Sequence, residues 1–395
     1  MATSNVGQPS RLTRSISLGA FSLFLPGRDP NPQANDRWAT TLSSAADIRL
    51  LKETAGPLTQ QDEPMLDPEV FLASLSKGWR PKVVCVYTTN AVVGILYTKE
   101  RVISGIPTGI VYADGSLGGF LLANAMPQQN ALSTALEALL ASPGIRGVHL
   151  RMLQNNSASD SIAQLITSRF LDGQSFLDVR SFPVEYGSHL WKHHAHLSLP
   201  DTYSRFLDRL GSSTRHNFRY YRKRFEASSH QFLDALALDD LRDAMLRLQP
   251  NSKFHAEAPS ERLEHCFNMV AASRRPLAIG LKHRNGEWLS VAGGWYRPGG
   301  AVLIFQCNKD LDFWRDSLST VLRSYLIELL IQRGLPELVI WAGTGPPLSR
   351  YVSYPPTIGI RLDVPTPSWR IARMLISTIG PHLPRRWANA AQWLC

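Results

Sequence analysis

The residues with the clearest chemical potential lie between positions 213 and 226, in the stretch STRHNFRYYRKRFE. This stretch holds five Lys or Arg side chains and a single carboxylate, Glu226. On a helix, Arg215, Arg219 and Arg222 share one face because residues three and four positions apart lie above one another. Guanidinium groups bind carboxylates and phosphates through paired hydrogen bonds. The row of arginines therefore predicts contact with an anionic group.

Three interpretations of this basic segment are open on the residues alone. It is a solvated helix face whose arginines pair with Asp208 or Glu226, a site for a phosphate-bearing ligand, or a nucleic-acid-binding element. Lys223 lies on the flank of the arginine row. The spacing of the aromatic residues is typical of core packing and not of base stacking; they are Phe218, Tyr221 and Phe225.

A second group of candidates stands at the ends of two predicted strands. Gly343 and Gly345 come at the end of the strand ELVIWAG and just after it. Glycines in that place let a ligand or another backbone approach closely, although a plain turn explains them equally well. Gln306 and Asn308 close the strand that ends in FQCN, and we expect them to line the same crevice.

Candidates for acid–base chemistry are few. Glu185, in FPVEYGSHLW, is one, and an exposed edge strand is the other interpretation of that segment. The histidines His193, His194 and His196 follow it. A metal would need a further carboxylate or cysteine within reach, so we expect no metal. The sequence has no GxSxG elbow, Walker loop or HExxH motif.

The elements that would position these residues occur twice along the chain. Each unit consists of a hairpin, a strand, an amphipathic helix and a final strand, which predicts two copies of one mixed α/β domain. In the first unit the predicted elements are 83–89, 92–102, 118–125, 128–142 and 148–153. In the second they are 277–283, 287–297, 301–307, 317–333 and 337–343.

Composition divides the chain further. Residues 1–65 are rich in Ser, Pro, Asn and Gln, and we expect a disordered leader. The first domain is then 66–190, and the second is 191–365 with the basic helix 212–227. Residues 366–395 form a helical tail, whose tryptophans we expect to dock on the body of the protein and not on a membrane.

The overall charge and the cysteines limit the class of protein. The 395 residues hold 42 Lys or Arg against 32 Asp or Glu, a net charge of +10, which favours an anionic partner. Hydrophobic residues make up 44%, enough for substantial cores. The four cysteines form no CxxC pair, and no apolar run reaches the roughly 20 residues of a membrane span. We therefore expect a cytoplasmic protein with no membrane span.

Together, these segments resemble the acetyltransferase family described as BioF2-like or CelD-like. That family belongs to the GNAT superfamily and is related to FemABX-like peptidyltransferases. The resemblance covers roughly residues 80–350. Its matching residues lie in the basic helix and in a terminal G-x-G…Y element; they are Ser212, Arg215, Arg219, Arg222, Lys223, Arg224, Gly343, Gly345 and Tyr351.

The resemblance implies two tandem GNAT-like domains, each a mixed sheet flanked by helices, that transfer an acyl group. The donor would be an acyl-CoA such as acetyl-CoA, and the acceptor an amine such as an amino sugar or another small molecule. Arg215, Arg219, Arg222 and Lys223 would contact phosphates. Tyr351, Glu185 and Gln306 would serve the reaction, with Gly343 and Gly345 lining the cleft.

The sequence departs from the family in two places. Val352 follows Tyr351 where a lysine is typical of the family. The glycine-rich pyrophosphate loop before the long helix is absent, because residues 308–317 contain no glycine and three aspartates. Phosphate binding by the basic helix is one response to this departure. The alternatives are an aminoacyl-tRNA donor with the same fold, and a non-catalytic protein that binds an anionic ligand or partner.

Overall fold

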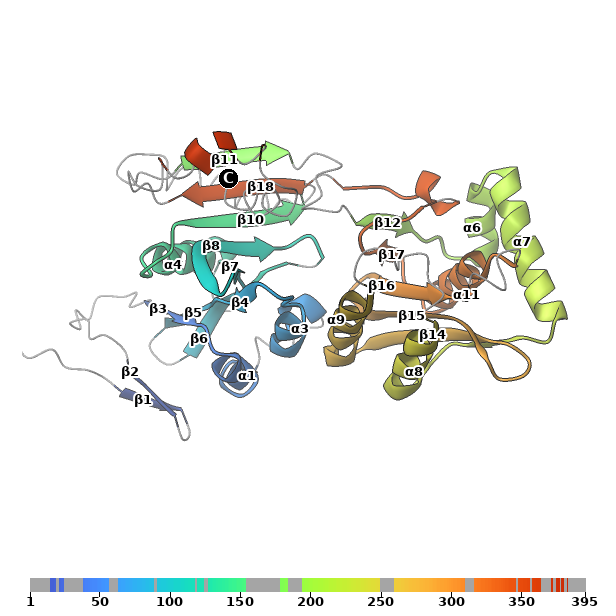
Figure 1. Cartoon of the computed structure of the whole chain (residues 1–395), viewed down its shortest axis with the longest axis horizontal. Coiled ribbons are helices and arrows are strands. Elements are labelled where there is room, and N and C mark those ends of the chain that lie inside the picture. The colour runs from blue at the N-terminus through green and yellow to red at the C-terminus, as the bar shows by residue number, and fades with distance from the viewer. Residues whose placement is uncertain are drawn as a thin grey trace, which may run out of the picture.

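The chain folds into two lobes that lie side by side (Figure 1). The computed structural model describes residues 15–18, 21–24, 38–56, 63–88, 91–117, 119–123, 127–153, 178–183, 194–248, 259–309, 316–345, 347–355 and 357–363, with a few positions between 371 and 382. A short hairpin, β1 (Ser15–Leu18) with β2 (Phe21–Phe24), stands apart from both lobes.

The N-terminal lobe contains two sheets. The four-stranded sheet has the order β3 (Trp38–Leu42), β5 (Val83–Thr88), β6 (Ala91–Leu96) and β9 (Leu121–Ala123). The six-stranded sheet has the order β11 (Asp178–Pro183), β18 (Thr357–Asp363), β10 (Gly147–Leu153), β8 (Ile106–Asp114), β7 (Lys99–Ile103) and β4 (Trp79–Pro81). Its helices are α1 (Ala45–Thr54), α3 (Pro68–Ala73) and α4 (Gln128–Leu140), with the 3-10 turn η1 (Pro64–Leu66).

The C-terminal lobe is a six-stranded sheet with helices on both faces. Its order is β12 (Ala195–Ser198), β17 (Glu337–Ile340), β16 (Gly300–Asn308), β15 (Trp288–Arg297), β14 (Pro276–Lys282) and β13 (Gln231–Leu233). One hydrophobic core lies under α6 (Tyr203–Arg209), α7 (Ser212–Ala227) and α11 (Leu318–Gln332). A second core lies under α8 (Leu238–Leu248) and α9 (Pro259–Ala272) on the opposite face.

The repeated plan appears as a strand, a helix and a parallel strand in each lobe. In the first lobe β8 is followed by β9, a short strand of the other sheet, then by α4 and by β10, which pairs parallel to β8. In the second, β16 is followed by α11 and then β17, which pairs parallel to β16. The mixed α/β architecture with two similar units, predicted from the hydrophobic patterns, is confirmed.

Two predicted boundaries differ from the structure. Residues 38–54 lie inside the predicted leader, yet β3 pairs with β5, and Ile48 of α1 is fully buried, because the apolar face of α1 packs on the N-terminal lobe. β18 lies inside the predicted C-terminal domain, yet it pairs antiparallel with β10 and β11 of the first lobe. The chain therefore returns to the first lobe after completing the second.

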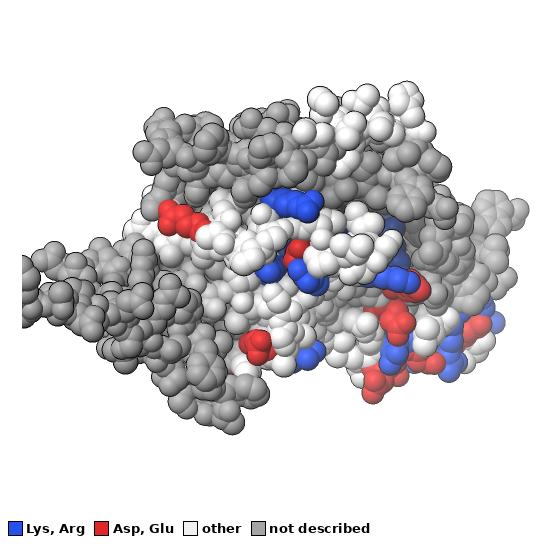
Figure 2. Space-filling model, turned by 60° about the vertical axis from the view of Figure 1, so that its left-hand side comes forward, with Lys and Arg blue, Asp and Glu red and all other residues white. Residues whose placement is uncertain are grey.

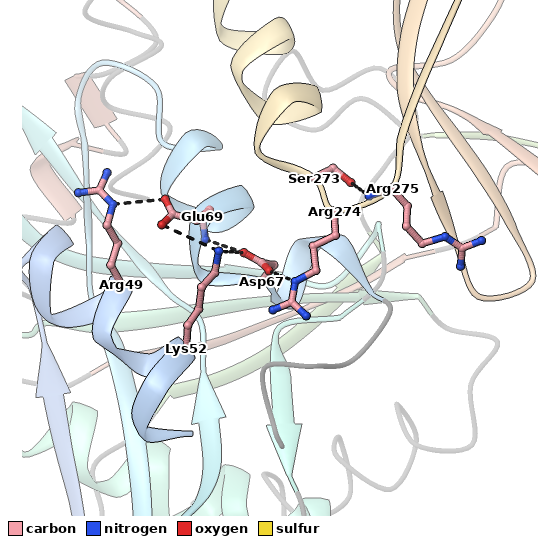
Figure 3. Close-up of polar contacts among 7 residues, drawn as sticks. All are labelled: Arg49, Lys52, Asp67, Glu69, Ser273, Arg274 and Arg275. Atoms are coloured by element: carbon pink, nitrogen blue, oxygen red, sulfur yellow. Dashed lines mark hydrogen bonds and ion pairs between the residues drawn. The ribbon is translucent and has the colours of Figure 1, made fainter. Parts of the chain in front are cut away.

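A buried carboxylate helps to join the lobes (Figure 3). Asp67, whose exposed fraction is 3%, accepts a hydrogen bond from the backbone N–H of Glu69 at 2.8 Å and so caps α3. Its other oxygen accepts one from Nε of Arg274, in the turn after α9, at 2.9 Å. Lys52 of α1 approaches the same side chain at 3.5 Å. Because the charge of Asp67 is desolvated, this contact between the lobes depends on all its donors.

Within the described residues, no helix combines the length and apolar character that crossing a bilayer requires.

Candidate functional site

The two parallel strands of the C-terminal lobe separate at their carboxyl ends. β16 and β17 pair from Ala301↔Leu338 to Leu303↔Ile340, and Trp341 then donates its backbone N–H to the Leu303 carbonyl at 2.9 Å. β16 continues to Asn308 without this partner. Open sheets bind ligands outside the carboxyl ends of parallel strands, where neighbouring connections diverge. This edge is the candidate site.

A bulge shapes β16 just before it separates from β17. The register between β15 and β16 shifts at Gly293 and Gly294. A Cβ atom on Gly294 would lie 1.9 Å from the carbonyl oxygen of Val302, so only glycine permits this close approach of the strands. The bulge redirects the last residues of β16, including Gln306.

Four polar side chains meet at this edge, and we call them the strand-end cluster: Gln306, Asn308, Arg323 and Thr344. Arg323 of α11 donates from Nε to Oε1 of Gln306 at 3.1 Å and from Nη1 to Oγ1 of Thr344 at 2.9 Å. Gln306 donates in turn to Oδ1 of Asn308 at 3.0 Å. The guanidinium thus bridges the end of β16 and the loop after β17.

The charge of Arg323 has no carboxylate partner among the described residues. Both acceptors of Arg323 are neutral, and burial lowers the pKa of its guanidinium. The mostly buried side chains of Arg151, Arg222 and Arg297 differ, since each pairs with Asp or Glu. A half-buried cation held by neutral groups is suited to an oxygen atom that carries or develops negative charge.

Further hydrogen bonds hold the loop that carries Thr344. Ala342 adopts a left-handed conformation with φ of 61°, which is strained for a residue with a Cβ atom. Its backbone N–H donates to Nδ1 of His194 at 3.2 Å. Since Nδ1 accepts, Nε2 carries the proton toward Oγ of Ser116, 3.1 Å away in the N-terminal lobe. The first lobe thus helps to position a loop of the second.

The basic helix α7 uses most of its arginine row within the protein. Arg222 contacts Glu226 at 3.0 Å and Glu328 at 2.6 Å, and its guanidinium lies 4.1 Å from the ring centre of Tyr325. Burial alone would lower the pKa of Arg222, but the contacts with the two glutamates outweigh this effect and raise it. Arg215 donates to Asp208 at 3.3 Å and to the Leu210 carbonyl at 3.1 Å. Both arginines therefore serve the packing of α7.

The remaining predicted cations of α7 point to solvent. Arg219 and Lys223 are exposed, and neither forms an ion pair within the described part of the chain. Phe218 and Phe225 are buried on the opposite side of the helix, as their spacing predicts. Two of the four predicted phosphate contacts are thus available to a ligand.

Tyr351 lies at the N-terminus of the basic helix. Its hydroxyl accepts a hydrogen bond from the backbone N–H of Gly211 at 2.8 Å and lies 3.4 Å from Oγ1 of Thr214. Both contacts lower the pKa of the phenol, and the contact with Thr214 has the larger effect. The structure therefore brings the predicted G-x-G…Y segment to the predicted basic helix.

Gly343, with φ of 86°, and Gly345 flank Thr344 in the loop that separates Tyr351 from β17. Glu185 and His193 lie outside the described residues. Among the described residues, no group of histidine, cysteine and carboxylate side chains is placed to hold a metal ion.

Sequence reasoning missed Arg323, Thr344 and the structural part played by His194. Arg323 was detectable as a single cation in the apolar stretch SLSTVLRSYLIELL, where such a residue needs a polar partner. His194 stood out in the sequence, but as a potential metal ligand.

No protein-family model and no curated protein sequence matches this chain. Solved structures do. A crystal structure of FemX superposes with a TM-score of 0.57 at 9% identity, covering 84% of this chain and 99% of that one. The C-terminal domain of a putative lysylphosphatidylglycerol synthetase from Agrobacterium fabrum gives 0.49 at 9% identity over 85% and 97%. A tandem GNAT protein from the clavulanic acid biosynthesis pathway gives 0.43 at 10% identity over 84% and 99%.

These comparisons concern the fold. At such identities the likeness to FemX establishes a shared architecture, and it agrees with the two strand–helix–strand units described above. The predicted mixed α/β chain with two similar units is confirmed, whereas the assignment of these units to the GNAT superfamily stays a prediction. The narrower assignment to the BioF2-like or CelD-like family stays a prediction.

Proposed function

We propose that the protein transfers an acyl group, such as acetyl, from an acyl-CoA thioester to an amine at the strand-end cluster. The observation that supports this most strongly is Arg323, a cation held at the separated ends of β16 and β17 by neutral acceptors only. Acyl transfer needs few reactive side chains, because the thioester is already activated. It needs a donor that stabilises the oxygen on which charge develops.

In this proposal the amine nitrogen attacks the thioester carbonyl carbon, and the carbonyl oxygen gains negative charge next to Arg323. The C–N bond forms, the C–S bond breaks, and the nitrogen loses a proton. The thiolate leaves and is protonated. Gln306 orients the guanidinium through its Oε1 atom and is thus a positioning residue. Removal of a donor to such an oxygen typically lowers kcat by about 10² to 10³.

Tyr351 and the exposed cations complete the proposed site. The lowered pKa of the Tyr351 phenol suits a group that gives a proton to the leaving thiolate. Glu185 stays a candidate base. Arg219 and Lys223 are free to bind the phosphates of the donor, which would compensate for the missing glycine-rich loop. The proposed acceptor is a small amine, such as an amino sugar.

A thermal-shift titration with acetyl-CoA and longer acyl-CoAs tests this proposal. A ligand that binds the folded state raises the melting temperature by mass action. We expect a saturable rise that Arg219→Met and Lys223→Met weaken and that Arg205→Met, another exposed arginine of the same lobe, leaves unchanged. No rise with any acyl-CoA contradicts the proposed donor.

A second candidate donor is aminoacyl-tRNA, favoured by the exposed Arg219 and Lys223 and by the net charge of +10. Against it, Figure 2 shows one face of the molecule on which described basic side chains lie singly or beside acidic ones, without a broad basic surface. The two donors differ in their response to salt. Binding of tRNA would weaken steeply as salt rises, because each neutralised phosphate releases counterions.

A further inference from the structure

Exposed apolar side chains are concentrated in the C-terminal tail. Among the described residues, seven large hydrophobic side chains are exposed, and four of them are Ile371, Met374, Leu375 and Ile379, with exposed fractions of 57%, 62%, 49% and 50%. The described residues between 371 and 379 are helical. The spacing of the four side chains puts them on one face of a helix. We call them the tail face.

The tail face differs from the helices that pack within the lobes. α11 is about as apolar, but its leucines and isoleucines have exposed fractions of 8% or less because they cover the sheet. A contiguous apolar face left in water marks an interaction surface. The tryptophans that we predicted to dock on the body lie outside the described residues. In the described part of the tail, Ile376 is half-buried, and the four side chains of the tail face are exposed.

The sequence around the tail face indicates which partner covers it. Residues 364–395 contain four arginines and no Asp or Glu, and they hold three of the ten tryptophans. An apolar helix face accompanied by arginines and tryptophans is typical of helices that lie in the interface of an anionic membrane. A second copy of the tail would bring like charges together, which opposes self-association. The charged residues are Arg370, Arg373, Arg385 and Arg386.

We propose that the tail docks on the surface of a bilayer that contains anionic phospholipids, with the tail face at the boundary between headgroups and acyl chains. The protein is then held at the membrane surface without crossing the bilayer. Figure 1 draws the described helical residues of the tail, in red, at the end of the N-terminal lobe that holds β11, away from α7 and α11. Docking there leaves the strand-end cluster of the other lobe accessible. This inference does not rest on the proposed acyl transfer.

Vesicle cosedimentation of the full chain tests the inference. The probes are vesicles of phosphatidylcholine alone and vesicles in which about a third of the lipid is phosphatidylglycerol. The test variant carries Ile371→Asp and Met374→Asp. The control is Leu246→Asp, which puts the same charge at an apolar side chain of α8 that is 53% exposed. Circular dichroism establishes that the fold is kept, which is expected because all three side chains are at the surface.

We expect the unaltered chain and the Leu246→Asp control to sediment with the anionic vesicles, and less with neutral ones. The tail variant should bind at least about tenfold more weakly. Binding should also weaken as salt rises, since part of the attraction is electrostatic. Equal sedimentation of tail variant and control overturns the proposal, as does the absence of binding to anionic vesicles. A drop in oligomer mass of the tail variant, without lipid, would instead assign the tail face to a second copy.

Discussion

The buried carboxylate between the lobes allows a prediction whose magnitude follows from its contacts. Asp67→Ala removes the cap of α3, worth about 1 kcal/mol. It also removes the hydrogen bond from Arg274. We assign this charged hydrogen bond about 1.5 kcal/mol, the lower end of the usual range for such bonds, because 46% of the Arg274 side chain is exposed. The expected loss in the free energy of unfolding is therefore about 2.5 kcal/mol.

Asp67→Asn separates the two contributions. The amide keeps an oxygen that can cap α3 but loses the negative charge that faces Arg274, so we expect a loss of about 1.5 kcal/mol. Asp201→Ala is the matched control, since Asp201 pairs with Arg205 where both side chains are more than 60% exposed. Such pairs contribute less than about 0.5 kcal/mol.

Urea unfolding followed by tryptophan fluorescence measures all three variants. If the free energies of unfolding of both Asp67 variants fall within about 0.5 kcal/mol of that of the control, the contact between the lobes contributes nothing beyond a surface pair, contrary to this prediction.

Three further predictions concern single residues. Burial raises the pKa of Glu63 from 4.5 to about 7. Its contribution to stability is therefore present below pH about 4.5 and lost as the pH rises through about 7. Glu63→Gln should remove this pH dependence and increase the free energy of unfolding by up to about 3 kcal/mol above pH 7, which thermal melts at several pH values would measure. Tyr351→Phe leaves the Gly211 N–H without its acceptor and should cost about 1 kcal/mol in urea unfolding, with no change counting against the contact. Gly294→Ala forces a Cβ to within 1.9 Å of a carbonyl oxygen and should cost more than about 3 kcal/mol or prevent folding, whereas Gly56→Ala meets no atom within 4 Å and should be nearly neutral.

The C-terminal lobe was largely predictable because its elements are apolar and closely spaced in sequence. The predicted strands 277–283, 287–297 and 301–307 correspond to β14, β15 and β16, and the predicted helix 317–333 corresponds to α11. The N-terminal lobe was harder. The segment 92–102 is two strands, β6 and β7, which belong to different sheets, and no local pattern shows that change.

Strand β8 was not predicted, because it contains residues that usually occur in turns. β8 contains Pro107 and Gly109, and it falls in the gap between the predicted elements 92–102 and 118–125. Gly109 has φ of 75°, and a Cβ there would lie 2.1 Å from the Gly144 carbonyl oxygen. The glycine is thus required by close packing inside the strand, and that neighbour is set by tertiary structure.

The candidate site was predictable only in part. Gln306, Gly343 and Gly345 were recognised because they end or follow apolar strands, and Tyr351 because it matches the G-x-G…Y element of the family that the sequence resembles. Arg323 was not, since its partners lie 17 and 21 positions away in the sequence and meet it only where β16 and β17 separate. Of the three interpretations of the basic helix, pairing with Asp208 or Glu226 is the one that Arg215 and Arg222 follow. The further partner of Arg222, Glu328 of α11, was not predicted because only the tertiary structure brings it close.

The most direct test of acyl transfer at the strand-end cluster is a steady-state assay that follows release of free CoA from acetyl-CoA with a panel of small amines, amino sugars included. It compares the unaltered protein, Arg323→Met and Arg205→Met. We predict amine-dependent turnover, a loss of about 10² to 10³ in kcat for Arg323→Met, and no loss for Arg205→Met. Amine-dependent turnover that Arg323→Met leaves intact would contradict the assignment of the site, and absence of turnover with every acyl-CoA and amine would contradict the proposed reaction.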